Sequence, residues 1–202
     1  MMNLKRNLIV VFLLLFYKVG FSQNIQIPSA DSIYKKEVSF INDLIKIQEY
    51  DEAIDKLKSL VLSLDNESEK GFCYWLLYFS YSSKGDIEAN AQNHLEAIQL
   101  YNSALKYLQI NNQFLKDIDF TPFETYTSRG ICYALLKNYK TAISDYDNAI
   151  YLKPEHGLAY FNRGVAYHNL GDINKACSDY IDADKYGYPV ESRLIEGCNA
   201  LR

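Results

Sequence analysis

A stretch of 34 residues occurs twice in succession, at 123–156 and at 157–190, and no other feature limits the fold as strongly. The two copies share small residues at the same places, because Gly130 matches Gly164 and Ala142 matches Ala176. They also share aromatic and charged residues, in the pairs Tyr126 and Tyr160, Arg129 and Arg163, Tyr133 and Tyr167, Asp145 and Asp179, and Tyr146 and Tyr180. A fixed period of this length is typical of stacked helical hairpins. We expect the two glycines to lie where the helices of each hairpin approach most closely.

The pattern resembles the tetratricopeptide repeat, a helix–turn–helix unit of 34 residues. By this resemblance, the residues that define the repeat are Gly130, Gly164, Tyr133, Tyr167, Ala142, Ala176, Tyr146, Tyr180 and the closing Pro154; the second copy has Tyr188 at the last place and Pro189 one place later. Arg129 and Arg163 resemble a sub-pattern in which this arginine pairs with an aspartate of the second helix. The resemblance implies an all-α fold, a right-handed α-solenoid of about four hairpins with a C-terminal capping helix.

The same frame is weaker before residue 123. Residues 34–67 resemble a divergent repeat, and 71–111 resemble a further unit that contains Gly85, Ala97 and Tyr101. This unit begins near Gly71, and we expect it to have seven residues too many between Gly85 and Ala97, so that the turn between its helices is enlarged or its second helix starts early. Residues 112–122 belong to no unit, and 191–202 are long enough for one capping helix. The repeat domain therefore spans 34–202.

By resemblance, the first helices of the units line a concave groove. The residues expected to bind a partner there are Phe72, Trp75, Phe79, Ile131, Leu135, Phe161, Asn162, Val165 and His168. Family members that hold the acidic C-terminal tails of heat-shock chaperones use lysine, arginine and asparagine at these places, and here only Asn42 and Asn162 have a suitable type. We therefore expect a protein or peptide ligand of apolar character, bound by a scaffold or adaptor.

Two alternatives to this hypothesis remain open. The groove aromatics could instead serve as stacking platforms for a glycan, in a glycan-binding or enzyme-accessory module. The non-repeat segment 112–122, which contains Phe114, Leu115, Ile118 and Phe120, could also fold over the groove and fill it.

The N-terminus has the three parts of a secretory signal peptide, at 1–22. Lys5 and Arg6 precede an apolar stretch at 8–17, and the small residues Gly20 and Ser22 precede Gln23. Because ten apolar residues are too few for a membrane-spanning helix, which needs about 20, cleavage before Gln23 is favoured over a retained anchor. An N-terminal extension at 23–33 would follow. We expect an exported protein, periplasmic or secreted, and the composition looks like that of a Gram-negative bacterium with an AT-rich genome.

Charge and residue spacing narrow the function classes. Removing 1–22 takes away three lysines and arginines and no acid, so the formal net charge changes from −4 to −7. Such a chain is a poor ligand for nucleic acids or anionic membranes. The histidines His94, His156 and His168 have no spacing typical of a nucleophile or metal site. We predict no catalytic residues, no metal and no cofactor.

The four cysteines, Cys73, Cys132, Cys177 and Cys198, show no Cys-x-x-Cys spacing, so a zinc site is not expected. Buried thiols and disulfides both remain possible. If a disulfide forms, Cys177–Cys198 is the candidate pair, because the second helix of the last repeat should pack on the capping helix.

Overall fold

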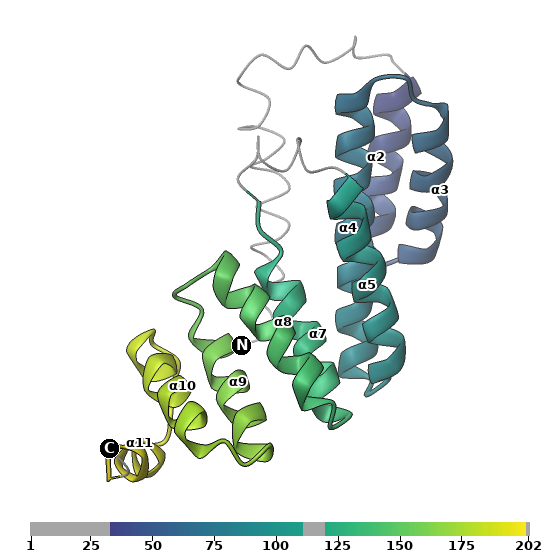
Figure 1. Cartoon of the computed structure of the whole chain (residues 1–202). Helices are drawn as coiled ribbons and strands as arrows, with labels where there is room; N and C mark the ends of the chain where they lie inside the picture. The colour runs from purple at the N-terminus through teal and green to yellow at the C-terminus, as the bar shows by residue number, and fades with distance from the viewer. Residues whose placement is uncertain (1–32, 111–119, 201–202) are drawn as a thin grey trace.

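The computed structural model describes residues 33–110 and 120–200, and every regular element within these ranges is a helix. The helices are α2 (Ile33–Lys46), α3 (Tyr50–Ser63), α4 (Glu67–Asn90), α5 (His94–Ile110), α7 (Phe123–Leu135), α8 (Tyr139–Leu152), α9 (Gly157–Asn169), α10 (Ile173–Lys185) and α11 (Ser192–Ala200). They stack as successive antiparallel pairs with α11 at the end (Figure 1). The expected all-α solenoid with a terminal capping helix is confirmed. The signal segment 1–22, the extension at 23–32 and residues 112–119 lie outside the described residues.

The expected insertion in the second unit is wrong. The turn between α4 and α5 spans only 91–93, like the turns at 136–138 and 170–172. The spacing from Gly85 to Ala97 also equals that from Gly130 to Ala142. The unit therefore begins at Tyr78, and the additional residues form the N-terminal part of α4, at 67–77. This part of α4 continues the helix because its apolar residues, among them Cys73, Leu76 and Leu77, pack into a core with α2 and α3.

The glycines mark the closest contact within each hairpin, as expected. A Cβ atom on Gly130 would lie 2.7 Å from Cε1 of Tyr146, and one on Gly164 would lie 2.8 Å from Cε1 of Tyr180. Gly85 makes the same contact with Tyr101, at 2.7 Å. Since real Cβ atoms essentially never approach this closely, only glycine allows each tyrosine ring to lie against the first helix.

The turns of the hairpins repeat one backbone conformation. Gln48, Gln92, Lys137 and Gly171 all have positive φ, between 60° and 82°, and each is the fifteenth residue of a unit that begins at 34, 78, 123 or 157. At the third of these turns the Lys137 amide donates to the Ala134 carbonyl (2.9 Å), and the next amide donates to the Tyr133 carbonyl (2.8 Å). These are the two hydrogen bonds of a Schellman motif. Residues 34–67 are therefore a hairpin of the same kind.

Two ion pairs, each between a half-buried arginine and a buried aspartate, tie the helices of the C-terminal units together. Arg129 donates from Nε and Nη2 to Asp145 (2.8 and 2.6 Å), and Arg163 donates in the same way to Asp179 (2.9 and 2.7 Å). The expected pairing is confirmed, and it occurs within each unit. The remaining Nη1 group reaches the preceding unit, at Asn102 for Arg129 and at Asp147 for Arg163.

The electrostatics of the Arg163 pair favour the charged state. Burial by itself lowers the pKa of the Arg163 guanidinium, but the hydrogen bonds and the charge of Asp179 more than offset this, and the pKa rises above its ordinary value. Burial also raises the pKa of the Asp179 carboxyl, so the cost of desolvating this carboxylate opposes its attraction to Arg163.

The C-terminal helix is joined to the last repeat by a disulfide between Cys177 and Cys198. Around it, Leu194 and Ile195 of α11 pack on a cluster that includes Tyr180. Cys73 and Cys132 are buried and free, and burial raises their thiol pKa values to about 12 and about 11. Both expected states of cysteine thus occur in one chain. Among the described helices, none is long and apolar enough to cross a membrane.

Candidate interaction surface

The first helices of neighbouring units contact one another, α4 with α7 and α7 with α9. We call the surface they share the inner face. In the register fixed by the glycines, the places expected to line it hold Phe79, Ser82, Ser83, Asp86, Ala89 and Asn90 of α4, Glu124, Thr127, Ser128, Ile131, Ala134 and Leu135 of α7, and Leu158, Phe161, Asn162, Val165, His168 and Asn169 of α9.

Two of the predicted binding residues do not belong to this face. Phe72 and Trp75 lie in the part of α4 that precedes the unit, and both pack against the N-terminal core. Their rings stack at a centroid distance of 5.9 Å, and Trp75 stacks in turn on Phe79 at 6.2 Å. The prediction was wrong because the unit was counted from Gly71 rather than from Tyr78. Phe79 stays at an inner-face place as the second residue of its unit, and its half-buried ring also packs against the N-terminal core and the cluster around Tyr78.

The remaining predicted residues come from α7 and α9, and most of their apolar side chains are half-buried. Ile131 packs against the cluster around Tyr146, and Val165 against the cluster around Tyr180. The Phe161 ring is covered by Tyr180 and Tyr188, at centroid distances of 5.8 and 4.8 Å. The apolar area offered to a ligand is therefore smaller than the sequence suggests.

Of the other three predicted residues, two are exposed to solvent and one makes a side-chain hydrogen bond. Leu135 at the end of α7 is 59% exposed, and His168 near the end of α9 is also exposed. The Asn162 side chain donates to the Leu158 carbonyl at 2.9 Å. Leu135 is thus the largest exposed apolar anchor among the predicted binding residues.

Of the segment expected to fill the groove, only 120–122 lies within the described residues. Phe120 packs edge-on against Tyr78, with ring centroids 5.2 Å apart, and joins a cluster with Leu105 and Leu108. Whether 112–119 cover the inner face stays a prediction, because they lie outside the described residues.

A hydrogen-bonded seam joins α4 to α7, and the sequence analysis missed it. The Tyr78 and Thr125 hydroxyls are 2.6 Å apart, and the Ser82 hydroxyl is 3.0 Å from that of Thr125. Burial raises the pKa of Tyr78 well above its ordinary value, and the charges of Glu124 and Asp86 raise it further. The hydrogen bonds with Thr125 and Ser82 lower this pKa, but by less than burial raises it.

The seam is extended by the tyrosine that contacts Gly85. The Tyr101 hydroxyl donates to Oδ1 of Asp86 at 2.7 Å, which ties this carboxylate of α4 to α5. Correct counting of the unit would have placed Asp86 at a groove position and made the pattern visible in the sequence.

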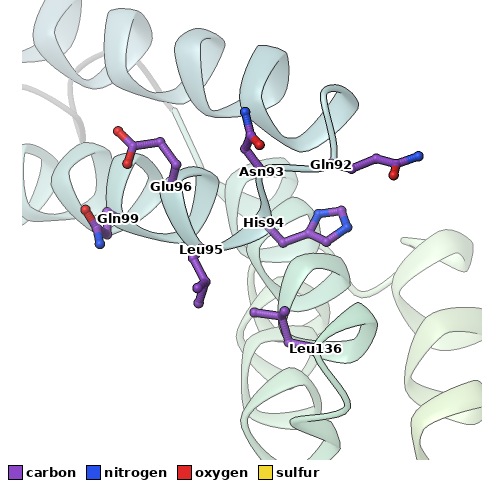
Figure 2. A pocket seen from close by; sticks show the side chains of 7 residues that line it. All are labelled: Gln92, Asn93, His94, Leu95, Glu96, Gln99 and Leu136. Atoms are coloured by element: carbon purple, nitrogen blue, oxygen red, sulfur yellow. The ribbon is translucent and has the colours of Figure 1, made fainter.

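A hollow of about 590 Å³ lies at the edge formed by the turns, between the start of α5 and the end of α7 (Figure 2). Its lining residues are Gln92, Asn93, His94, Leu95, Glu96, Gln99 and Leu136. Leu95 and Leu136 are 68% and 42% exposed. The sequence analysis missed this hollow because its residues lie in the turns and at the start of α5 rather than at groove positions.

The described residues contain no group of three His, Cys, Asp or Glu side chains that could hold a metal ion. The histidines lie apart. Nε2 of His156 is 3.1 Å from the Thr127 hydroxyl, and its ring packs edge-on against Phe123. These contacts join α9 to α7 and give His156 a structural role.

Comparison with known proteins agrees with the repeat assignment. Residues 123–156 match one family model described as a tetratricopeptide repeat, and 145–178 match a second. Heat shock protein STI1 of Saccharomyces cerevisiae is 27% identical over 100 residues, which are 50% of this chain and 15% of that protein. Tetratricopeptide repeat protein 6 of Homo sapiens is 30% identical over 103 residues, 51% of this chain and 17% of that protein. The match thus spans less than a fifth of either relative.

A solved structure shows the same fold, and a second is similar over part of this chain. MamA from Desulfovibrio magneticus RS-1 has a TM-score of 0.53 at 17% identity, covering 86% of this chain and 87% of that one. The first repeat domain of Spaghetti (RPAP3), bound to the HSP90 peptide SRMEEVD, has a TM-score of 0.49 at 22% identity, covering 63% of this chain and 94% of that one. The family models thus identify tetratricopeptide repeats within residues 123–178 of this chain.

Proposed function

We propose that this protein is a non-catalytic interaction scaffold or adaptor that binds a peptide or a partner protein on its inner face. The observation that carries this proposal is that different side chains of the first helices have different roles. The glycines and arginines at fixed places hold the solenoid together, while other residues of the same helices, such as Leu135 and Glu124, remain exposed. A repeat surface of this kind is extended and suited to binding other chains.

The remaining polar chemistry supports a binding role. His94, His156 and His168 belong to different units, and the contacts of His156 join helices rather than form a cluster of catalytic groups. An active site needs a nucleophile or acid–base pair within hydrogen-bond reach of a shared ligand position. We therefore assign no catalytic residue.

We further propose that the chain is exported, into the periplasm or the medium of a Gram-negative bacterium, without stable membrane insertion after cleavage. The signal-peptide pattern at 1–22 supports this. The disulfide between Cys177 and Cys198 adds independent support, because such bonds persist in oxidising compartments. The net charge of −7 after cleavage disfavours nucleic acid as a partner.

The glycan alternative is not favoured. A sugar stacks on the open face of an aromatic ring, but Phe161 is covered by Tyr180 and Tyr188, and Trp75 packs in the N-terminal core. The aromatic side chains that suggested this function therefore serve mainly in packing.

Affinity capture from the native cell envelope, followed by mass spectrometry, tests the proposal. Leu135→Asp places a charge on the inner face at an exposed position, so the fold should be kept and the partner lost. Leu62→Asp is the matched control, because Leu62 is 89% exposed on α3, away from the inner face. Equal capture by both folded variants would place the binding surface elsewhere.

A further inference from the structure

The lysine and arginine side chains of the helices that form the inner face all make ion pairs within the protein. The repeat part of α4, at 78–90, and the helices α7 and α9 each contain one lysine or arginine: Lys84, Arg129 and Arg163. All three stand at the seventh place of their units. Lys84 pairs with Asp51 of α3, and the two arginines pair with the buried Asp145 and Asp179. A ligand carboxylate therefore finds no cation on these helices that is not already paired.

The exposed charges on the inner face near the seam are negative. Glu124 directly precedes Thr125, whose hydroxyl is 3.0 Å from that of Ser82. Asp86 follows Ser82 by four residues, so both lie on the same side of α4. The two carboxylates thus flank one seam, and both residues are exposed.

Apolar side chains lie on the same helices. Phe79 is half-buried seven residues before Asp86, and Leu135 is exposed at the end of α7. The combination of two carboxylates with apolar anchors is complementary to a segment that alternates basic and apolar residues.

We infer, building on the proposed function, that the inner face selects a basic amphipathic helix of a partner protein, whose lysine or arginine side chains lie against Asp86 and Glu124 and whose apolar side chains contact Phe79 and Leu135. An acidic tail is rejected for two reasons. It would meet like charges at the seam, and it could recruit Arg129 or Arg163 only by leaving a buried aspartate unpaired, which is strongly destabilising. Complementary charge also steers association and suppresses wrong partners.

Fluorescence anisotropy with labelled peptides tests the inference on the full exported chain. Two amphipathic peptides of about 15 residues, a length at which an isolated helix begins to be stable, share one leucine pattern and carry either lysine or glutamate at the polar positions. The peptide SRMEEVD serves as a third probe. We expect the lysine peptide to bind, with an affinity that falls as salt is added, and the two acidic peptides to bind at least about tenfold more weakly.

Two double variants distinguish the effect of the carboxylates on the inner face from the effect of the net charge of the protein. Asp86→Asn with Glu124→Gln should weaken binding of the lysine peptide about fivefold, the size expected for two exposed charge contacts. Asp184→Asn with Glu196→Gln removes the same charge from exposed positions on α10 and α11 and should change binding less than about twofold. Circular dichroism verifies the fold, and Glu124→Gln alone serves if the double variant unfolds.

The outcomes distinguish the inference from the function on which it rests. Equal weakening by both double variants, or tighter binding of an acidic peptide than of the lysine peptide, would overturn the inference and leave peptide binding intact. Failure of all three peptides, together with equal envelope capture by the Leu135 and Leu62 variants, would overturn both.

Discussion

Substituting alanine for glycine at two positions should change stability in opposite directions. At Gly130 the added Cβ atom lies 2.7 Å from the Tyr146 ring, about 0.7 Å closer than ordinary contact at 3.4 Å. Tyr146 is 1% exposed, so its ring cannot swing into solvent. At Gly197 of α11 nothing lies within 4 Å of the added atom. Both glycines are inside helices, so the backbone benefit of alanine is shared.

The magnitudes follow from these two terms. Alanine in place of a helical glycine stabilises by about 0.5–1 kcal/mol, and this is the whole effect expected for Gly197→Ala. Overpacking a well-packed contact costs about 1–3 kcal/mol, so Gly130→Ala should lower the free energy of unfolding by about 1 kcal/mol net. Subtracting the two measured changes cancels the backbone term and gives the overpacking cost directly.

The assay is urea denaturation of the oxidised protein followed by far-ultraviolet circular dichroism, with hydrogen exchange to localise changes in α11. A Gly130→Ala variant as stable as Gly197→Ala would refute the reasoning, because the glycine–tyrosine contact would then not define the repeat register.

Three further predictions concern other parts of the chain. Arg129→Met leaves the carboxylate of Asp145 buried and unpaired, so we expect a loss of about 3–5 kcal/mol of unfolding free energy in denaturant titrations; a loss below about 1 kcal/mol, the value of an exposed pair, would contradict this. Reducing the Cys177–Cys198 disulfide, which joins residues 21 apart, should lower the free energy of unfolding by about 3 kcal/mol. The amides of α11 should then be the first to lose protection from hydrogen exchange, and unchanged protection there would show that packing alone holds this helix. N-terminal sequencing of exported protein should find Gln23 or a residue close to it as the first residue, whereas an intact initiator methionine would indicate a retained anchor.

The C-terminal repeats could be predicted from the sequence because their defining contacts leave a visible pattern. Only glycine permits the tyrosine ring to approach the first helix, so Gly130 and Gly164 must recur with Tyr146 and Tyr180. The ion pairs recur for the same reason, since a buried aspartate needs its arginine.

The second unit was miscounted for an equally physical reason. No residue at 67–77 interrupts a helix, so the start of the repeat within α4 leaves no mark in the sequence. Gly171 makes one turn recognisable, but the equivalent Gln92 adopts positive φ without being a glycine, so the position of that turn was hidden. Because of this error, Trp75 was predicted to line the groove and Asp86 was not.

The contacts that hold the solenoid also restrict which ligands it can bind. If a ligand carboxylate drew Arg163 away from Asp179, which is 4% exposed, the cost of the unpaired buried charge would be about 3–5 kcal/mol. A new exposed ion pair with the ligand contributes only about 0–1 kcal/mol. Because the loss exceeds the gain several-fold, Arg129 and Arg163 are not available to a ligand carboxylate. Lys84 is already paired with the exposed Asp51, so exchanging this partner for a ligand carboxylate gains little. The exposed acidic and apolar side chains of these helices remain for binding. The ion pairs that hold the repeats together therefore favour a partner with basic and apolar residues.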